Sequence, residues 1–153
     1  MDTHSPRVSN VSKEFTSDAD WQRIWFSTQQ RSWRSLAIIP SDSGVEVDRV
    51  AEALVATGQM HGEKQVTLLS ARGVQFTNVK RLIDALEEMT SRGECVVVPV
   101  DPISENPSAI PVLQATSAGL LVVRLGESHL SSARNIIEIA GRERLLGSIV
   151  LGA

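Results

Sequence analysis

Five short apolar runs, separated by segments with helical periodicity, dominate the chain from Ser35 onward. The runs cover 35–39, 65–69, 94–98, 119–123 and 145–151. Continuous runs rich in β-branched residues are typical of strands that are buried on both faces of a parallel sheet. Helical stretches that can serve as crossovers lie between the runs, near 46–57, 76–91, 108–117 and 131–141. The sequence therefore predicts an α/β fold with a Rossmann-like parallel sheet of about five strands and helices on both faces.

The length of 153 residues fits one domain. We expect a flexible N-terminal arm over 1–16, where the sequence is polar and lacks periodicity. The remainder, 17–153, is predicted to be a single α/β domain, with an aromatic amphipathic helix at 17–33 and the sheet core at 35–152. Within that core, helices should stop at Gly58, Gly93 and Gly141.

Charge and composition exclude several functional classes. The net charge of -3 argues against a nucleic-acid partner, because most such proteins are basic. The single cysteine, Cys95, excludes an intramolecular disulfide, and the three histidines lie too far apart for a metal site. No apolar run reaches the ~18–20 residues that a membrane span needs. We therefore expect a cytoplasmic protein without a membrane span of its own.

Four segments, taken in order, resemble the P-loop ATPases of the bacterial tyrosine kinase and partitioning-ATPase group. Pro99-Val100-Asp101-Pro102 is similar to the family's Asp-x-Pro-Pro element, and the strand at 118–123 to its Asp-Gly-Val-Leu-Leu-Val-Val strand. The closing strand at 146–151 and the lead-in at 33–38 resemble their counterparts too. The resemblance covers about residues 20–152 and implies a P-loop NTPase-type fold.

The family's phosphate loop is degenerate here. In the family, backbone N–H groups surround the phosphates, a lysine reaches the β- and γ-phosphates, and Ser or Thr holds Mg²⁺. With Gly44 aligned on the first glycine of Gly-x-Gly-Lys-Ser-Thr, the second glycine is replaced by Glu46 and the lysine by Val47. Asp48 and Arg49 replace the serine and the threonine. Carboxylates at ~4 Å from phosphate oxygens would cost on the order of 1–4 kcal/mol each.

Two further positions agree with this interpretation. Arg72 follows the second predicted strand, where the family has acidic residues, and Pro99 stands at the position of the Mg²⁺-linked aspartate. The chain has no tyrosine, and hence no tyrosine-rich tail. We predict a catalytically inactive pseudo-ATPase with no catalytic residue, cofactor or metal. The alternative is an atypical nucleotide-binding ATPase or kinase that uses Asp101, in another register, together with Arg49 or Arg72.

An aromatic cluster suggests where a partner docks. Trp21, Trp25, Phe26 and Trp33 lie in one short segment beside Arg34. Core packing is the ordinary explanation of such a stripe, but Trp and Arg are also common interface anchors, and we predict partner binding by these five residues.

The resemblance implies a regulatory partner protein in bacterial exopolysaccharide synthesis or export. Its partner would be an inner-membrane polysaccharide chain-length protein or a related ATPase, which would hold the chain peripherally at the membrane. A homo-oligomer is a further option. A cell-division or DNA-related regulator of the same fold is the remaining alternative.

Overall fold

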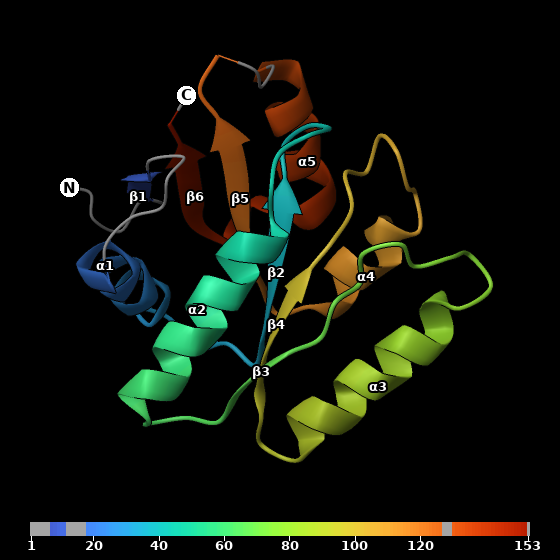
Figure 1. The fold of residues 1–153 in the computed structure, drawn as a ribbon. Coiled ribbons are helices and arrows are strands. Elements are labelled where there is room, and N and C mark those ends of the chain that lie inside the picture. The colour runs from blue at the N-terminus through green and yellow to red at the C-terminus, as the bar shows by residue number, and fades with distance from the viewer. Residues whose placement is uncertain (1–6, 12–17, 127–129, 153) are drawn as a thin grey trace.

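Six parallel strands form one sheet in the computed structural model, which describes residues 7–11, 18–126 and 130–152 (Figure 1). The elements in chain order are β1 (Arg7–Val11), α1 (Asp18–Thr28), β2 (Ser35–Pro40), α2 (Asp48–His61), β3 (Val66–Leu68), α3 (Val79–Ser91), β4 (Cys95–Pro99), α4 (Ala109–Ala115), β5 (Ala118–Arg124), α5 (Leu130–Ala140) and β6 (Leu145–Leu151), with a 3-10 turn at Arg142–Arg144. The strand order is β1-β6-β5-β2-β4-β3. The predicted fold class is confirmed, with six strands in place of about five.

The additional strand is β1, which lies inside the predicted flexible arm. It pairs in parallel with β6, from Arg7 opposite Gly147 to Val11 opposite Leu151. The arm prediction is therefore wrong for 7–11. The exposed edge of β6 offers unpaired backbone groups, and pairing with them stabilises a segment whose side-chain pattern alone does not indicate a strand. Residues 1–6 and 12–16 of the expected arm lie outside the described part of the chain.

The central strand β2 is buried along its whole length because helices cover both faces of the sheet. Leu36 and Ile38 belong to a hydrophobic cluster with α1 and α2. Ala37 and Ile39, which point the other way, belong to a second cluster with residues of α3, α4 and α5. This alternation follows from the period of two in a strand. It explains why the sequence shows continuous apolar runs instead of an apolar–polar alternation.

The ends of the helices agree with the glycine pattern at two of three positions. Gly93 and Gly141 follow α3 and α5 with φ of +89° and +93°. The predicted stop at Gly58 is wrong, because α2 continues to His61 and ends at Gly62, whose φ is +80°. Gly58 has a different role. A Cβ placed on it would lie 2.6 Å from Cη2 of Trp25, so the glycine lets α1 pack closely against α2.

Candidate functional site

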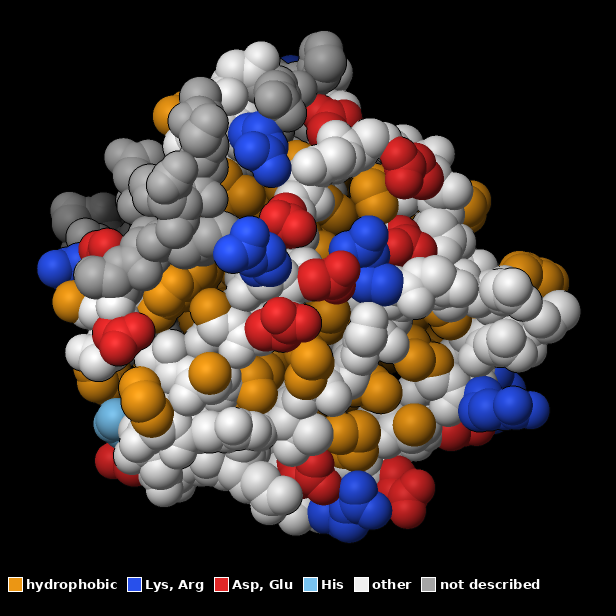
Figure 2. Space-filling model, in the orientation of Figure 1, with side chains coloured by type: hydrophobic (Ala, Val, Ile, Leu, Met, Phe, Trp, Pro, Cys, Tyr) orange, Lys and Arg blue, Asp and Glu red, His pale blue; other side chains and the backbone are white. Residues whose placement is uncertain are grey.

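Three loops meet at the edge of the sheet where the parallel strands end. They follow β2 (41–47), β3 (69–78) and β4 (100–108). In open α/β sheets, ligands bind at this edge. Figure 2 shows acidic and basic side chains interspersed over this part of the surface, near the start of α2. The candidate site is therefore built from the loops that the sequence analysis compared with the family's nucleotide site.

The loop after β2 occupies the position of the phosphate loop. Gly44 has a φ of +81°, which favours glycine. Val47, aligned with the family's lysine, is completely buried in the core beside Val50 and Leu54. Glu46 is exposed, and Asp48 is the first residue of α2. Because Val47 is apolar and buried, this position places no positive charge in the loop.

Arg72 connects the loops through two ion pairs. Its Nε donates a hydrogen bond to Oδ1 of Asp101 at 2.7 Å, and its Nη1 donates one to Oδ2 of Asp48 at 3.0 Å. We call Asp48, Arg72 and Asp101 the Arg72 cluster. Burial alone would lower the pKa of Arg72, but the hydrogen bond to Asp101 and the two negative charges outweigh burial and raise it. The guanidinium thus occupies the space between two carboxylates from neighbouring loops.

Asp101 is the most enclosed member of the cluster, with 16% of its side chain exposed. Its Oδ2 accepts hydrogen bonds from the backbone N–H of Gly73 and from Nδ2 of Asn106, each at 2.8 Å. Burial would raise the pKa of Asp101, but the hydrogen bonds from Asn106, Arg72 and Gly73 stabilise the charged form and lower that pKa. Asp101 is therefore an ionised carboxylate whose hydrogen-bonding capacity is largely used by its own chain.

Two further contacts tie the same loops together. Nδ2 of Asn106 also donates to the carbonyl oxygen of Val74 at 2.8 Å, and the hydroxyl of Ser43 donates to Glu105. Between the loops lies an open depression of about 300 Å³, which is lined by Gly44, Val45, Glu46, Asp48, Arg72, Pro102, Glu105 and Arg124. Three of these lining side chains are carboxylates and two are arginines.

The residues of this depression do not fit a nucleoside triphosphate with Mg²⁺. A phosphate site needs converging N–H donors and a lysine that is free to reach the phosphates. Here the lysine position is a core valine, and carboxylates stand at the positions of the second glycine and of the Mg²⁺-binding hydroxyl. Arg72 is engaged by Asp48 and Asp101.

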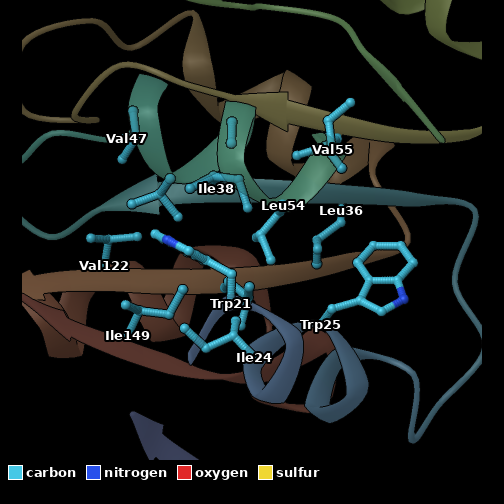
Figure 3. Packing of buried hydrophobic residues seen from close by; sticks show 14 of the residues in the cluster. Trp21, Ile24, Trp25, Leu36, Ile38, Val47, Leu54, Val55, Val122 and Ile149 are labelled. Carbon is cyan, nitrogen blue, oxygen red and sulfur yellow. The ribbon is translucent and has the colours of Figure 1, made fainter. Parts of the chain in front are cut away.

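The predicted docking segment differs from expectation, because three of its five residues belong to the core. Trp21, Trp25 and Trp33 are 6%, 2% and 5% exposed. Figure 3 shows Trp21, Ile24 and Trp25 projecting from α1 toward the buried residues of the sheet and α2. The docking prediction is wrong for the three tryptophans, because the large apolar surface of their rings is removed from water inside the protein.

Phe26 and Arg34 remain on the surface. Phe26 is 54% exposed and stacks edge-on against His61, with ring centroids 5.3 Å apart. Arg34 is exposed, and its backbone N–H donates to Oγ of Ser117. These two residues stay available for the predicted role, which the structure does not test.

Sequence reasoning named Asp48, Arg72 and Asp101 separately and missed that they form one cluster. A signal was present, because residues of opposite charge follow strands that pair side by side as β3 and β4. It also missed Phe76 in the loop after β3, which is 87% exposed.

The described residues offer neither a metal site nor a membrane-spanning helix. They contain no group of three or more histidine, cysteine, aspartate or glutamate side chains arranged to hold a metal ion. No helix of that part of the chain is both long and apolar enough to cross a bilayer.

The parallel sheet with helices on both faces is a P-loop NTPase-like α/β fold. Bacterial tyrosine kinase domains share this fold. The kinase domain of the Escherichia coli tyrosine kinase ETK superposes with a TM-score of 0.68 at 16% identity, over 88% of this chain and 73% of that one. The BceF tyrosine kinase domain gives 0.59 at 16% identity, over 88% and 74%.

The chimerical protein CapA2B2 gives a TM-score of 0.72 at 12% identity, over 97% of this chain and 94% of that one. No family model and no curated protein matches the sequence. At these identities the likeness establishes the fold, and any function has to be argued from the residues of the site.

Proposed function

We propose that this chain is a catalytically inactive relative of the bacterial tyrosine kinase domains, which acts as a partner or regulatory protein. The single observation that carries the proposal is the Arg72 cluster. Its guanidinium is bound by Asp48 and Asp101, at the edge of the sheet where a nucleotide of this fold would bind. The cation at this edge is thus already paired with the chain's own carboxylates.

The electrostatics of the loop support the absence of nucleotide binding. An incoming triphosphate would approach the carboxylates of Glu46, Asp48 and Glu105, and no lysine is among the described residues that line this depression. Recruiting Arg72 for the phosphates would leave Asp101 enclosed without its cation, which is costly for a carboxylate with so little exposure. The N-terminal dipole of α2 contributes up to ~1 kcal/mol at an exposed site, which is too little to offset the repulsion between the carboxylates and the phosphates.

Calorimetry with ATP and GTP, each with and without Mg²⁺, tests this proposal. We expect no heat of binding and no thermal shift at millimolar nucleotide, while the ETK kinase domain, measured in parallel, serves as the positive control. Micromolar binding that is lost in Asp101→Asn would instead support the atypical nucleotide-binding ATPase or kinase.

The setting that we propose is exopolysaccharide synthesis or export in the bacterial cytoplasm. The proposed partner is an inner-membrane polysaccharide chain-length protein or a related ATPase, as the family resemblance implies. Since the three tryptophans are buried, the surface candidates are Phe26 with Arg34 at one end of the molecule and Phe76 in the strand-end loops. Exposed aromatic residues are frequent interface anchors.

Binding of the purified cytoplasmic segment of a chain-length protein from the same genome distinguishes the two surfaces. Phe76→Ala should weaken binding at least tenfold if the partner contacts the strand-end loops, with Phe26→Ala as the matched control. The reverse pattern would assign the partner to α1. If the wild-type chain does not bind this segment at all, the proposed setting is wrong.

A further inference from the structure

Side-chain contacts within the chain connect the three strand-end loops. The loop after β2 is tied to the loop after β4 by the Ser43–Glu105 hydrogen bond. Asp48, at the start of α2, is tied to the loop after β3 by Arg72. The loops after β3 and β4 share the contacts of Asp101 with Arg72 and Gly73. The β4 loop is therefore linked to both of the other loops, and the β3 loop is linked to the start of α2, directly after the β2 loop.

In a nucleotide-binding protein of this fold, the bound phosphates and their cation lie between these loops and hold them. In this chain, both the negative and the positive charges between the loops come from side chains. The chain supplies the carboxylates from α2 and the β4 loop, and it supplies the cation from the β3 loop. Arg72 thus bridges α2 and the β4 loop from the wall of the depression in which a ligand of this fold would bind.

We infer that Arg72 is a built-in substitute for a bound ligand, which fixes the strand-end loops in one arrangement whether or not nucleotide is present. This inference rests on the proposed function and adds how the site is regulated: it has no nucleotide-dependent switch. Arg72 is a positioning residue, because it acts by holding the loops.

The geometry favours an arginine for this purpose. A guanidinium presents several N–H donors in a fixed plane, so Nε and Nη1 can serve two carboxylates at once. Charge-assisted hydrogen bonds of this kind are stronger than neutral ones. The enclosure of Asp101 adds to the effect, since water competes less for a carboxylate that is 16% exposed than for one on the open surface.

Hydrogen exchange of the full chain, followed by mass spectrometry, tests the inference. Arg72→Gln should speed exchange in 42–48, 71–78 and 101–108 on the order of tenfold, with strands β2, β4 and β5 unchanged. The matched control is Arg92→Gln, which breaks an arginine–glutamate pair with Glu94 far from the cluster. It should leave those three segments unchanged. Exchange within twofold of wild type in Arg72→Gln would overturn the inference.

A second variant covers the case in which Arg72→Gln does not fold. Asp48→Asn removes one ion pair at a half-exposed position, and it should loosen 42–48 while Asp101 keeps its hydrogen bonds. Unchanged exchange in 42–48 would then overturn the inference. Adding ATP with Mg²⁺ to the wild-type chain should change nothing. Protection by nucleotide would overturn the proposed function itself, which separates its failure from that of the inference.

Discussion

Gly58 decides how closely α1 and α2 approach, because any larger residue meets the indole of Trp25. A Cβ at this position would also lie 2.9 Å from Cγ2 of Val66 on β3. Because Gly58 has no side chain, α1 and β3 can both pack closely against α2 at this position.

Gly58→Ala should destabilise the protein although alanine favours helices. Overpacking costs about 1–3 kcal/mol and the gain in helix propensity is about 1 kcal/mol, so we expect a net loss of up to about 2 kcal/mol. Urea denaturation measures it. The double variant with Trp25→Phe should lose less than the sum of the single variants, since the smaller ring relieves the contact. Additive losses would mean that the contact with Trp25 is not the cause.

Asp101 makes stability depend on acid pH. Hydrogen bonds from Asn106, Arg72 and Gly73 lower the pKa of Asp101 in the folded state. Its contribution to the free energy of unfolding is therefore fully present above the ordinary carboxylate pKa of about 4. This contribution is lost as the pH falls through the lower, folded-state pKa. Asp101→Asn should cost about 1–2 kcal/mol at pH 7 and flatten the decline between pH 5 and 2. Denaturation at several pH values measures both effects. Asp84→Asn, on the exposed surface of α3, is the control, and an equal flattening there would contradict the assignment to Asp101.

At the scale of elements, α1 is a core helix. Trp33 Nε1 donates to the carbonyl oxygen of Thr28 at 2.9 Å, and the rings of Trp25 and Trp33 meet edge-to-face with centroids 6.1 Å apart. These contacts connect the end of α1 to the entry of β2.

Trp25→Ala should lower the free energy of unfolding by about 3–5 kcal/mol, as for other large core truncations. Phe26→Ala, one position along and half exposed, should stay within about 0.5 kcal/mol of wild type. Thermal unfolding followed by circular dichroism compares the two. Similar stabilities would mean that α1 does not pack as described.

Elements that a local pattern of apolar residues marks could be predicted from the sequence. Elements that depend on contacts with residues far along the chain could not. The runs at 35–39 and 145–151 became β2 and β6 because burial on both faces demands continuous apolar residues. Arg7–Val11 could not be recognised, since its partner strand lies at the other end of the chain. The loop residues at 44–49 could be aligned, whereas the joining of Arg72 to Asp48 and Asp101 depends on how three loops fold back toward each other.

For the whole molecule, β1 protects one edge of the sheet. Without it, β6 would present an unpaired edge, and such edges pair with other chains. β3 forms the opposite edge, where the carbonyl oxygen of Val66 accepts a hydrogen bond from Nε2 of Gln59 on α2. The exposed edges of this sheet are thus short or partly occupied.

Deleting residues 1–11 should lower the melting temperature and promote self-association, because both the pairing with β6 and its protection are lost. For a chain of this size, each kcal/mol lost corresponds to about 2–4 °C. Calorimetry and light scattering measure the two effects, and deletion of 1–6 alone is the control. A monomer with unchanged melting temperature after the longer deletion would contradict the pairing of β1 with β6.

The pairing of β1 with β6 also sets an order of events during synthesis. Arg7 lies opposite Gly147, so β1 pairs with a strand that is synthesised 140 residues later (147 − 7). At about 5–20 residues per second, β1 waits roughly 7–28 s for its partner. Strands β2 and β4, by contrast, have both of their neighbours by the time β5 has emerged. Pairing of β1 with β6 therefore cannot precede the synthesis of β6, and until then the backbone groups of β1 have no partner in this sheet.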